Sequence, residues 1–146
     1  MSLVIRPVTT KSERKAFIDF PYRLYAKEPT WVPPLRFERK KHMDPAKSPF
    51  FEHAEVQLFL AERDGRVVGR ISAHVDHALN EHKGNDWGLW GFFECEDDQE
   101  AADALLDAAE QWLRARDRDR MVGPFDFSTN HECGLLVEGY DRDPII

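Results

Sequence analysis

The amino-acid sequence predicts an α/β fold in which a mixed, mostly antiparallel sheet is flanked by helices. Residues 55–63 and 66–75 have the character of strands, and they flank Asp64-Gly65, a dipeptide typical of the tight turn between antiparallel strands. Residues 87–127 then have the patterns of a strand, a helix and a strand, an order that favours parallel pairing through a right-handed connection.

The N-terminal third is predicted to contain one strand and two helices. Residues 3–8 form the strand, and the T-x-x-E spacing of residues 10–13 indicates a capping box, so a helix should begin at about Lys11. Pro21 should interrupt this helix, because proline has no amide hydrogen and clashes with the preceding turn. A second helix is expected over about residues 34–43.

A third long strand is expected over residues 87–95, after a polar loop at residues 77–86. Because side chains alternate along a strand, one face should carry Trp87, Leu89 and Phe93 and the other should carry Trp90 and Phe92. Apolar side chains on both faces predict a central strand that is covered on each side.

The clearest helix pattern covers residues 97–116. Its apolar stripe, which should pack on the sheet, consists of Ala101, Leu105, Ala108 and Trp112. A last strand is expected over residues 120–127. The tail after it shows neither a second long helix nor a closing hairpin, so we expect an open sheet edge that needs either a partner, such as a second copy in a homodimer, or further residues of the chain.

The composition fits one globular domain over residues 1–146, since 42% of the residues are hydrophobic and 32% are charged. The net charge of -7 argues against a nucleic-acid partner, and the one basic cluster, residues 36–42, is expected to be a solvated helix face. No apolar run approaches the roughly 20 residues that cross a bilayer, so no membrane partner is expected. Two cysteines without CxxC spacing indicate a reducing compartment, and we expect a cytoplasmic protein.

Two segments carry a resemblance to a known family. GFFECEDDQEAADALLDAAEQWL (residues 91–113) and GPFDFSTNHECGLLVEGYD (residues 123–141), in this order of elements, resemble the GNAT superfamily of acyl-CoA N-acyltransferases and, within it, a group of bacterial GNAT-like N-acetyltransferases. The resemblance implies acyl transfer from acyl-CoA, with acetyl-CoA as cofactor, to a small-molecule amine, in a site where the fourth and fifth strands splay apart. Proteins of that group continue past this C-terminus. We therefore expect this chain to be the N-terminal part of a longer protein and to lack the C-terminal elements of the fold.

The turn after the third long strand departs from the pattern of the superfamily. In the superfamily this turn carries the motif Q/R-x-x-G-x-G/A, whose backbone amides bind the CoA pyrophosphate. In this chain the turn consists of residues 94–100 (ECEDDQE), which contain no glycine and no arginine. At about 4 Å and an effective dielectric constant of about 20, one like-charge pair costs about 4 kcal/mol. The pyrophosphate-binding role is therefore not carried onto these residues, and we expect the acidic side chains to cap their own helix.

The candidate site lies at the carboxyl ends of the strands expected over residues 87–95 and 120–127. Its predicted cleft residues are Phe92, Phe93, Glu94, Cys95, Ser128, Thr129 and Asn130. Glu94 is a candidate general base if burial raises its pKa. The Ser-Thr-Asn cluster fits a substrate contact and equally fits a turn or a helix cap.

Other reactive side chains form no convincing site. The histidines of residues 74–82 cannot converge on one ion from an extended strand, so no metal is expected and they should lie at the surface. Cys95 lies among carboxylates that disfavour a thiolate, and the spacing of His131 and Cys133 is too common to indicate a catalytic pair. The alternative to an enzyme is a non-catalytic GNAT-like module that binds a ligand or a protein in the same cleft.

Overall fold

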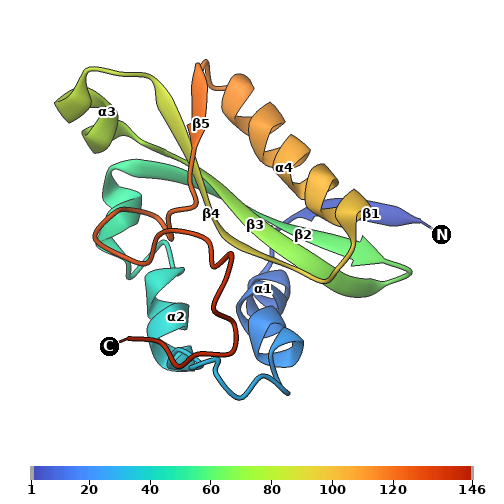
Figure 1. Ribbon diagram of the computed structural model, residues 1–146. Coiled ribbons are helices and arrows are strands. Elements are labelled where there is room, and N and C mark those ends of the chain that lie inside the picture. The colour runs from blue at the N-terminus through green and yellow to red at the C-terminus, as the bar shows by residue number, and fades with distance from the viewer. Residues whose placement is uncertain (1, 146) are drawn as a thin grey trace.

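The computed structural model describes residues 2–145 and contains one five-stranded sheet in the order β1-β2-β3-β4-β5 (Figure 1). The first three pairings are antiparallel, and β4 pairs with β5 in parallel. The predicted α/β fold with a mixed, mostly antiparallel sheet is therefore confirmed. The strands are β1 (Leu3–Pro7), β2 (Ala54–Arg63), β3 (Arg66–Asp76), β4 (Trp87–Cys95) and β5 (Arg120–Val122).

Helices cover both faces of the sheet. The long helix α4 packs on one face, and α1 and α2 lie on the other (Figure 1). The helical segments are α1 (Lys11–Leu24), α2 (Arg36–His42), the 3-10 turn η1 (Pro49–Glu52), α3 (His77–Lys83) and α4 (Gln99–Arg114). None of the helices within residues 2–145 is both long enough and apolar enough to cross a bilayer.

The two faces have different cores. Under α4 the core is aliphatic, and the side chains that α4 buries there are Ala101, Leu105, Ala109 and Leu113. The predicted stripe is rotated slightly, since Ala108 and Trp112 are only partly buried beside this core. Under α1 and α2 the core is largely aromatic, and it includes Phe17, Phe50, Phe92 and Phe127.

Helix α1 begins as predicted and passes through Pro21. Thr10 and Glu13 form the capping box, with the Glu13 amide donating to Thr10 Oγ1 at 3.1 Å. The predicted interruption at Pro21 is wrong, because α1 continues to Leu24. A proline leaves the carbonyl four residues earlier without its helical donor, and here Arg70 Nη1 donates to the Phe17 carbonyl at 2.8 Å.

Three further expectations need correction. Residues 77–83, predicted as loop, form α3, because Asp76 caps its first turn and Gly84 ends it with a left-handed conformation at φ 63°. The last strand stops at Val122 and not at residue 127, and a cis peptide bond joins Gly123 to Pro124. His74, expected at the surface, is completely buried.

A bulge in β4 changes which side chains share a face. Phe92 has φ 50°, and the pairing moves from Ser72↔Gly91 to Arg70↔Glu94, so β4 contains one extra residue there. Trp90 and Phe93 therefore lie together under α4, with ring centroids 6.2 Å apart, while Phe92 faces α1. The predicted grouping, which placed Trp90 with Phe92, is wrong for this reason.

Candidate functional site

The segment after β5 lies against the bulge of β4. The Phe125 amide donates to the Trp90 carbonyl at 2.8 Å, and a side chain at Gly91 would overlap the Phe125 carbonyl, with the added carbon 1.7 Å from its oxygen. The Phe92 amide donates to Asp126 Oδ1 at 3.0 Å. The left-handed residue of the bulge thus holds the Asp126 carboxylate beside β4.

A second carboxylate, Glu94, lies two residues farther along β4 on the same face as Phe92. The hydroxyl group of Tyr25, at the end of α1, donates to Glu94 Oε2. Burial raises the pKa of Glu94, although the hydrogen bond from Tyr25 and the charge of Arg70 both oppose that rise. Burial and the contact with Glu94 in turn raise the pKa of the Tyr25 phenol, so Tyr25 stays a donor.

Burial also raises the pKa of Asp126, to about 6, against the opposing effect of the hydrogen bond from the Phe92 amide. A carboxyl group with a pKa near the working pH both accepts and releases protons readily, which is the requirement for general acid–base catalysis. Asp126 therefore has the chemical properties expected of a base in this site.

Two guanidinium groups accompany the carboxylates. Arg70 comes from β3 and is only 6% exposed. It lies opposite Glu94 in the antiparallel pairing of β3 with β4. Burial lowers the pKa of Arg70 to about 10, opposed by the charges of Glu94 and Asp126, so it remains positive at neutral pH. Arg39, from α2, binds Glu132 Oε1 at 2.6 Å, and both guanidinium carbons lie within 6 Å of the Phe92 ring, at 5.6 Å for Arg39 and 5.7 Å for Arg70.

We call Tyr25, Arg39, Arg70, Glu94 and Asp126 the carboxylate cluster. Its members come from the C-cap of α1, from α2, β3 and β4, and from the segment after β5, so the fold gathers them from five parts of the chain. Carboxylates beside the Phe92 ring can bind an ammonium group and take its proton, while the Tyr25 hydroxyl group holds Glu94 by donating to it. Within residues 2–145 no group of three or more His, Cys, Asp or Glu side chains is arranged to hold a metal ion.

The sequence-predicted cleft residues are divided by the fold. Phe92 and Glu94 lie in or against the carboxylate cluster, whereas Phe93 and Cys95 face α4 because of the bulge. Burial raises the pKa of the Cys95 thiol to about 11, the nearby Asp98 and Glu96 adding to this. Ser128, Thr129 and Asn130 line a separate hollow of about 170 Å³ beside Leu89 and Phe125.

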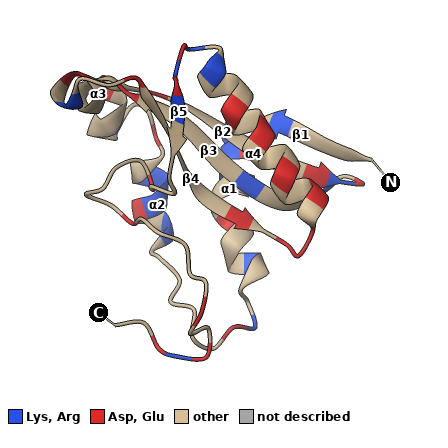
Figure 2. Cartoon of the chain, turned by 45° about the horizontal axis from the view of Figure 1, so that its top comes forward, with Lys and Arg blue, Asp and Glu red and all other residues tan. Residues whose placement is uncertain are grey.

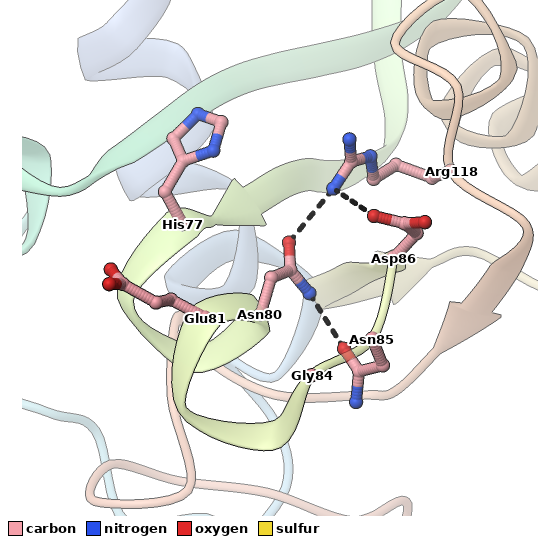
Figure 3. Close-up of a pocket in the computed structure, with 7 residues that line it drawn as sticks. All are labelled: His77, Asn80, Glu81, Gly84, Asn85, Asp86 and Arg118. Carbon is pink, nitrogen blue, oxygen red and sulfur yellow. Dashed lines mark hydrogen bonds and ion pairs between the residues drawn. The ribbon is translucent and has the colours of Figure 1, made fainter.

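A larger, open hollow of about 420 Å³ lies at α3 (Figure 3). Asn80 lies at its centre, donates to Asn85 Oδ1 at 2.9 Å and to the Trp87 carbonyl at 3.0 Å, and accepts from Arg118 Nη1 at 3.0 Å. These side chains satisfy one another and fix the turn into β4, so we assign the hollow a structural role. Its lining residues are His77, Asn80, Glu81, Gly84, Asn85, Asp86 and Arg118.

The acidic turn before α4 is held by arginines of the β2–β3 hairpin. Asp98 caps α4 by accepting from the Ala101 amide at 3.1 Å, which confirms the predicted capping role for this residue, and it binds Arg63 Nε at 2.8 Å. Glu96 binds Arg66 through two hydrogen bonds of 2.6 and 2.8 Å. Figure 2 shows the acidic residues of the turn and of α4 beside these basic residues. The start of α4 is thus occupied by side chains of the protein itself.

Four members of the cluster were missed by sequence reasoning. Asp126 is the one charged residue in the run GPFDFS, and Arg70 is the one charged residue in VVGRISA. A single charge inside an apolar run is the signal that could have identified them, because such a charge must find a partner if the run is buried. Tyr25 and Arg39 gave no comparable signal, since tyrosine and arginine are common on helix surfaces.

The chain is similar to two curated proteins. It is 50% identical over 145 residues to a protein named bacterial ceramide synthase from Caulobacter vibrioides, covering 99% of this chain and 38% of that protein. It is 40% identical over 141 residues to Protein YghO of Escherichia coli, covering 97% of this chain and 36% of that protein. The chain therefore spans less than two fifths of the length of either relative. No protein-family model matches it.

Solved structures identify the fold. A tandem GNAT protein from the clavulanic acid biosynthesis pathway superposes with a TM-score of 0.62 at 16% identity, over 80% of this chain and 34% of that one. A ribosomal-protein-alanine N-acetyltransferase from Brucella melitensis superposes with a TM-score of 0.53 at 17% identity, over 84% of this chain and 79% of that one. The chain has the GNAT fold. Within this fold the carboxylate cluster lies at the β4 bulge, next to the pairing of β4 with β5.

Proposed function

We propose that this chain forms part of an N-acyltransferase that moves an acyl group from acyl-CoA to an amine. The observation that carries the proposal is the pair of carboxylates, Glu94 and Asp126, held at the β4 bulge of a GNAT fold with pKa values raised by burial. An amine arrives at neutral pH largely as an ammonium ion and becomes a nucleophile only after losing a proton. A carboxylate with a raised pKa attracts the cation and accepts that proton.

The proposed acceptor is a long-chain amino alcohol, and the proposed donor is a long-chain fatty acyl-CoA. This choice rests on the relative named bacterial ceramide synthase, with which the chain shares 50% identity over 145 residues. A ceramide is the amide of a fatty acid and a long-chain amino alcohol. The relative is much longer than this chain, so we propose the activity for the protein to which this domain contributes.

In the proposed reaction Asp126 takes the ammonium proton, and the neutral amine attacks the thioester carbonyl carbon. The new C–N bond forms, the C–S bond breaks, and the CoA thiolate leaves and takes up the proton that the attacking nitrogen loses, while Asp126 returns its proton to water. Glu94, held by Tyr25, pairs with the ammonium group and positions it. Arg70 keeps a positive charge near both carboxylates, which favours their ionised forms between turnovers.

Product formation tests the proposal. The protein is incubated with a long-chain acyl-CoA and a long-chain amino alcohol, and amide formation is followed by mass spectrometry. We expect amide product and CoA release in equal amounts, both lost in Asp126→Asn. Absence of product, on folded protein whose melting temperature responds to the acyl-CoA, would contradict acyl transfer while leaving ligand binding intact.

The second candidate is a GNAT-like module that binds a ligand or a partner without catalysis. The favouring observation is the acidic turn at residues 96–98, which lacks glycine and whose side chains already cap α4. Thermal shift separates the two functions, because a ligand at 100 times its dissociation constant stabilises a protein by about 2.7 kcal/mol. A non-catalytic module whose ligand is not an acyl-CoA should show no shift with acetyl-CoA or with a long-chain acyl-CoA, and a shift without product would indicate acyl-CoA binding without catalysis.

A further inference from the structure

Exposed apolar side chains are concentrated on one side of the molecule. Nine large hydrophobic residues are exposed in the described part of the chain, and seven of them lie in residues 32–37 and 135–140. Phe37 is 67% exposed and Val32 is 61% exposed. Isolated exposed apolar residues are ordinary, but a contiguous group marks a surface that meets another apolar phase.

The two segments lie side by side. Thr30 Oγ1 donates to the Tyr140 carbonyl at 2.8 Å, and the Tyr140 hydroxyl donates to the Leu136 carbonyl at 3.0 Å. Figure 1 shows the C-terminal segment running along α2 and the connection that precedes it. The two segments that carry these seven residues are therefore neighbours, and we call the exposed apolar side chains on them the apolar surface.

Basic residues border this surface on the α2 side. Residues 27–42 contain five Lys or Arg and two Glu in a chain whose net charge is -7, and Figure 2 shows basic residues along α2. Arg36 pairs with Asp19 and Arg39 pairs with Glu132, whereas Lys40 and Lys41 are exposed. The tail carries its acidic residues at Glu132, Glu138, Asp141 and Asp143, whereas four of the seven residues of α2 are Lys or Arg, so the positive charge of this side is concentrated at α2.

We propose that α2 and the connection before it dock on an anionic lipid bilayer. Val32, Leu35 and Phe37 enter the boundary between headgroups and acyl chains, while Lys40 and Lys41 contact lipid phosphates. Segments that lie in a membrane interface combine Lys or Arg with Leu and aromatic residues in this way. The cores of protein interfaces are instead depleted in Lys, so a bilayer fits this combination better than a protein partner does. The basic cluster of residues 36–42, which we expected from the sequence to be a solvated helix face, would then bind lipid phosphates.

Helix α2 also reaches the carboxylate cluster. Arg39 on its inner side lies over the Phe92 ring, and Trp31 in the preceding connection packs on Tyr25 with ring centroids 5.2 Å apart. A bilayer bound at the outer side would therefore lie next to the cluster. The docking inference rests on exposure and charge alone, and it does not depend on the proposed acyl transfer.

Vesicle binding tests the inference without any acyl-transfer assay. The full chain is floated with vesicles of phosphatidylcholine mixed with phosphatidylglycerol and with vesicles of phosphatidylcholine alone. We expect binding to the mixed vesicles that weakens as salt is raised. Since each basic residue near an anionic surface contributes roughly fivefold, Lys40→Gln with Lys41→Gln should lower the partition coefficient about 30-fold. Leu35→Ser with Phe37→Ser should lower it at least about tenfold.

The matched control is Lys83→Gln with Arg120→Gln, which removes the same charge from α3 and β5, at the far end of the molecule (Figure 1). This control should bind mixed vesicles as the unchanged protein does. Equal loss in the control, or no binding to mixed vesicles by folded protein, would overturn the proposal. A dimer that Leu35→Ser with Phe37→Ser dissociates, without vesicle binding, would also overturn it by assigning the surface to a second copy.

Discussion

The two faces of β3 differ in what they bury. Towards α4 the strand presents apolar side chains, among them Ile71, Ala73 and Val75, which are at most 1% exposed. Towards α1 and α2 it presents Arg70, Ser72, His74 and Asp76, which are at most 6% exposed. Alternation of polar and apolar residues usually means that the polar face meets water.

Here the polar face is covered as completely as the apolar one. A buried polar group costs stability unless partners satisfy it, and on this face Arg70 Nε, Ser72 Oγ and His74 Nδ1 have no hydrogen-bond partner among the described residues. We infer that the α4 face contributes mainly stability, and that the α1 and α2 face holds groups whose charge states matter.

The largest stability effect is expected on the α4 face. Leu105 is completely buried, so Leu105→Ala should lower the free energy of unfolding by about 2–5 kcal/mol through lost burial and a cavity. Leu106→Ala, on the partly buried side of the same helix, is the control and should cost clearly less. Urea denaturation measures both. Equal losses would mean that α4 does not carry the core.

The next effect concerns pH and lies on the polar face. Burial lowers the pKa of His74 from 6.5 to about 4, although its ring nitrogen Nε2 lies 2.9 Å from the Phe127 carbonyl oxygen. Because the unfolded state binds the proton more tightly, this contribution to stability is complete above about pH 6.5 and is lost as the pH falls towards about 4. The loss should reach up to about 3 kcal/mol.

Unfolding of His74→Gln measures that contribution by difference. Asp126 acts with the opposite sign, since its raised pKa favours the folded state as the pH falls through about 6. The difference between the unchanged protein and His74→Gln removes this effect, because Asp126 is present in both. If the two proteins lost the same stability between neutral and acidic pH, His74 would not be the group that titrates.

A smaller effect should appear where Pro21 and Arg70 meet. Arg70→Met leaves the Phe17 carbonyl without its donor, but in the Pro21→Ala background the amide of residue 21 can supply one. A double-mutant cycle should therefore give a coupling of about 1 kcal/mol, with Arg70→Met less costly in the Pro21→Ala background. Additive costs would show that Arg70 does not compensate for the proline.

Local patterns in the sequence were sufficient for much of the fold. The Asp64-Gly65 turn, the Thr10 capping box and the Asp98 cap are each decided by residues within four positions of one another. The resemblance to GNAT proteins agrees with the fold found among solved structures. These features were predictable because the residues whose interactions decide them are close to one another in the sequence.

The site depended on contacts that are distant in sequence. The bulge at Phe92 is stabilised by Asp126, which is 34 residues away in the sequence. No local sequence motif predicts this bulge. Glu94 could be proposed from sequence, but its partner Tyr25 is 69 residues away. The same reason explains the error at Pro21, because the donor that replaces its amide comes from β3.

The central claim is that Asp126 and Glu94 activate an amine for acyl transfer, and the pH dependence of kcat/KM tests it most directly. We predict that kcat/KM of the unchanged protein rises as the pH passes about 6, where Asp126 loses its proton. Asp126→Asn should lower kcat/KM by about 100- to 10,000-fold and abolish the rise with pH. Glu94→Gln should raise KM for the amine but retain the rise of kcat/KM with pH. An Asp126→Asn protein with the unchanged rate and pH profile would contradict the claim.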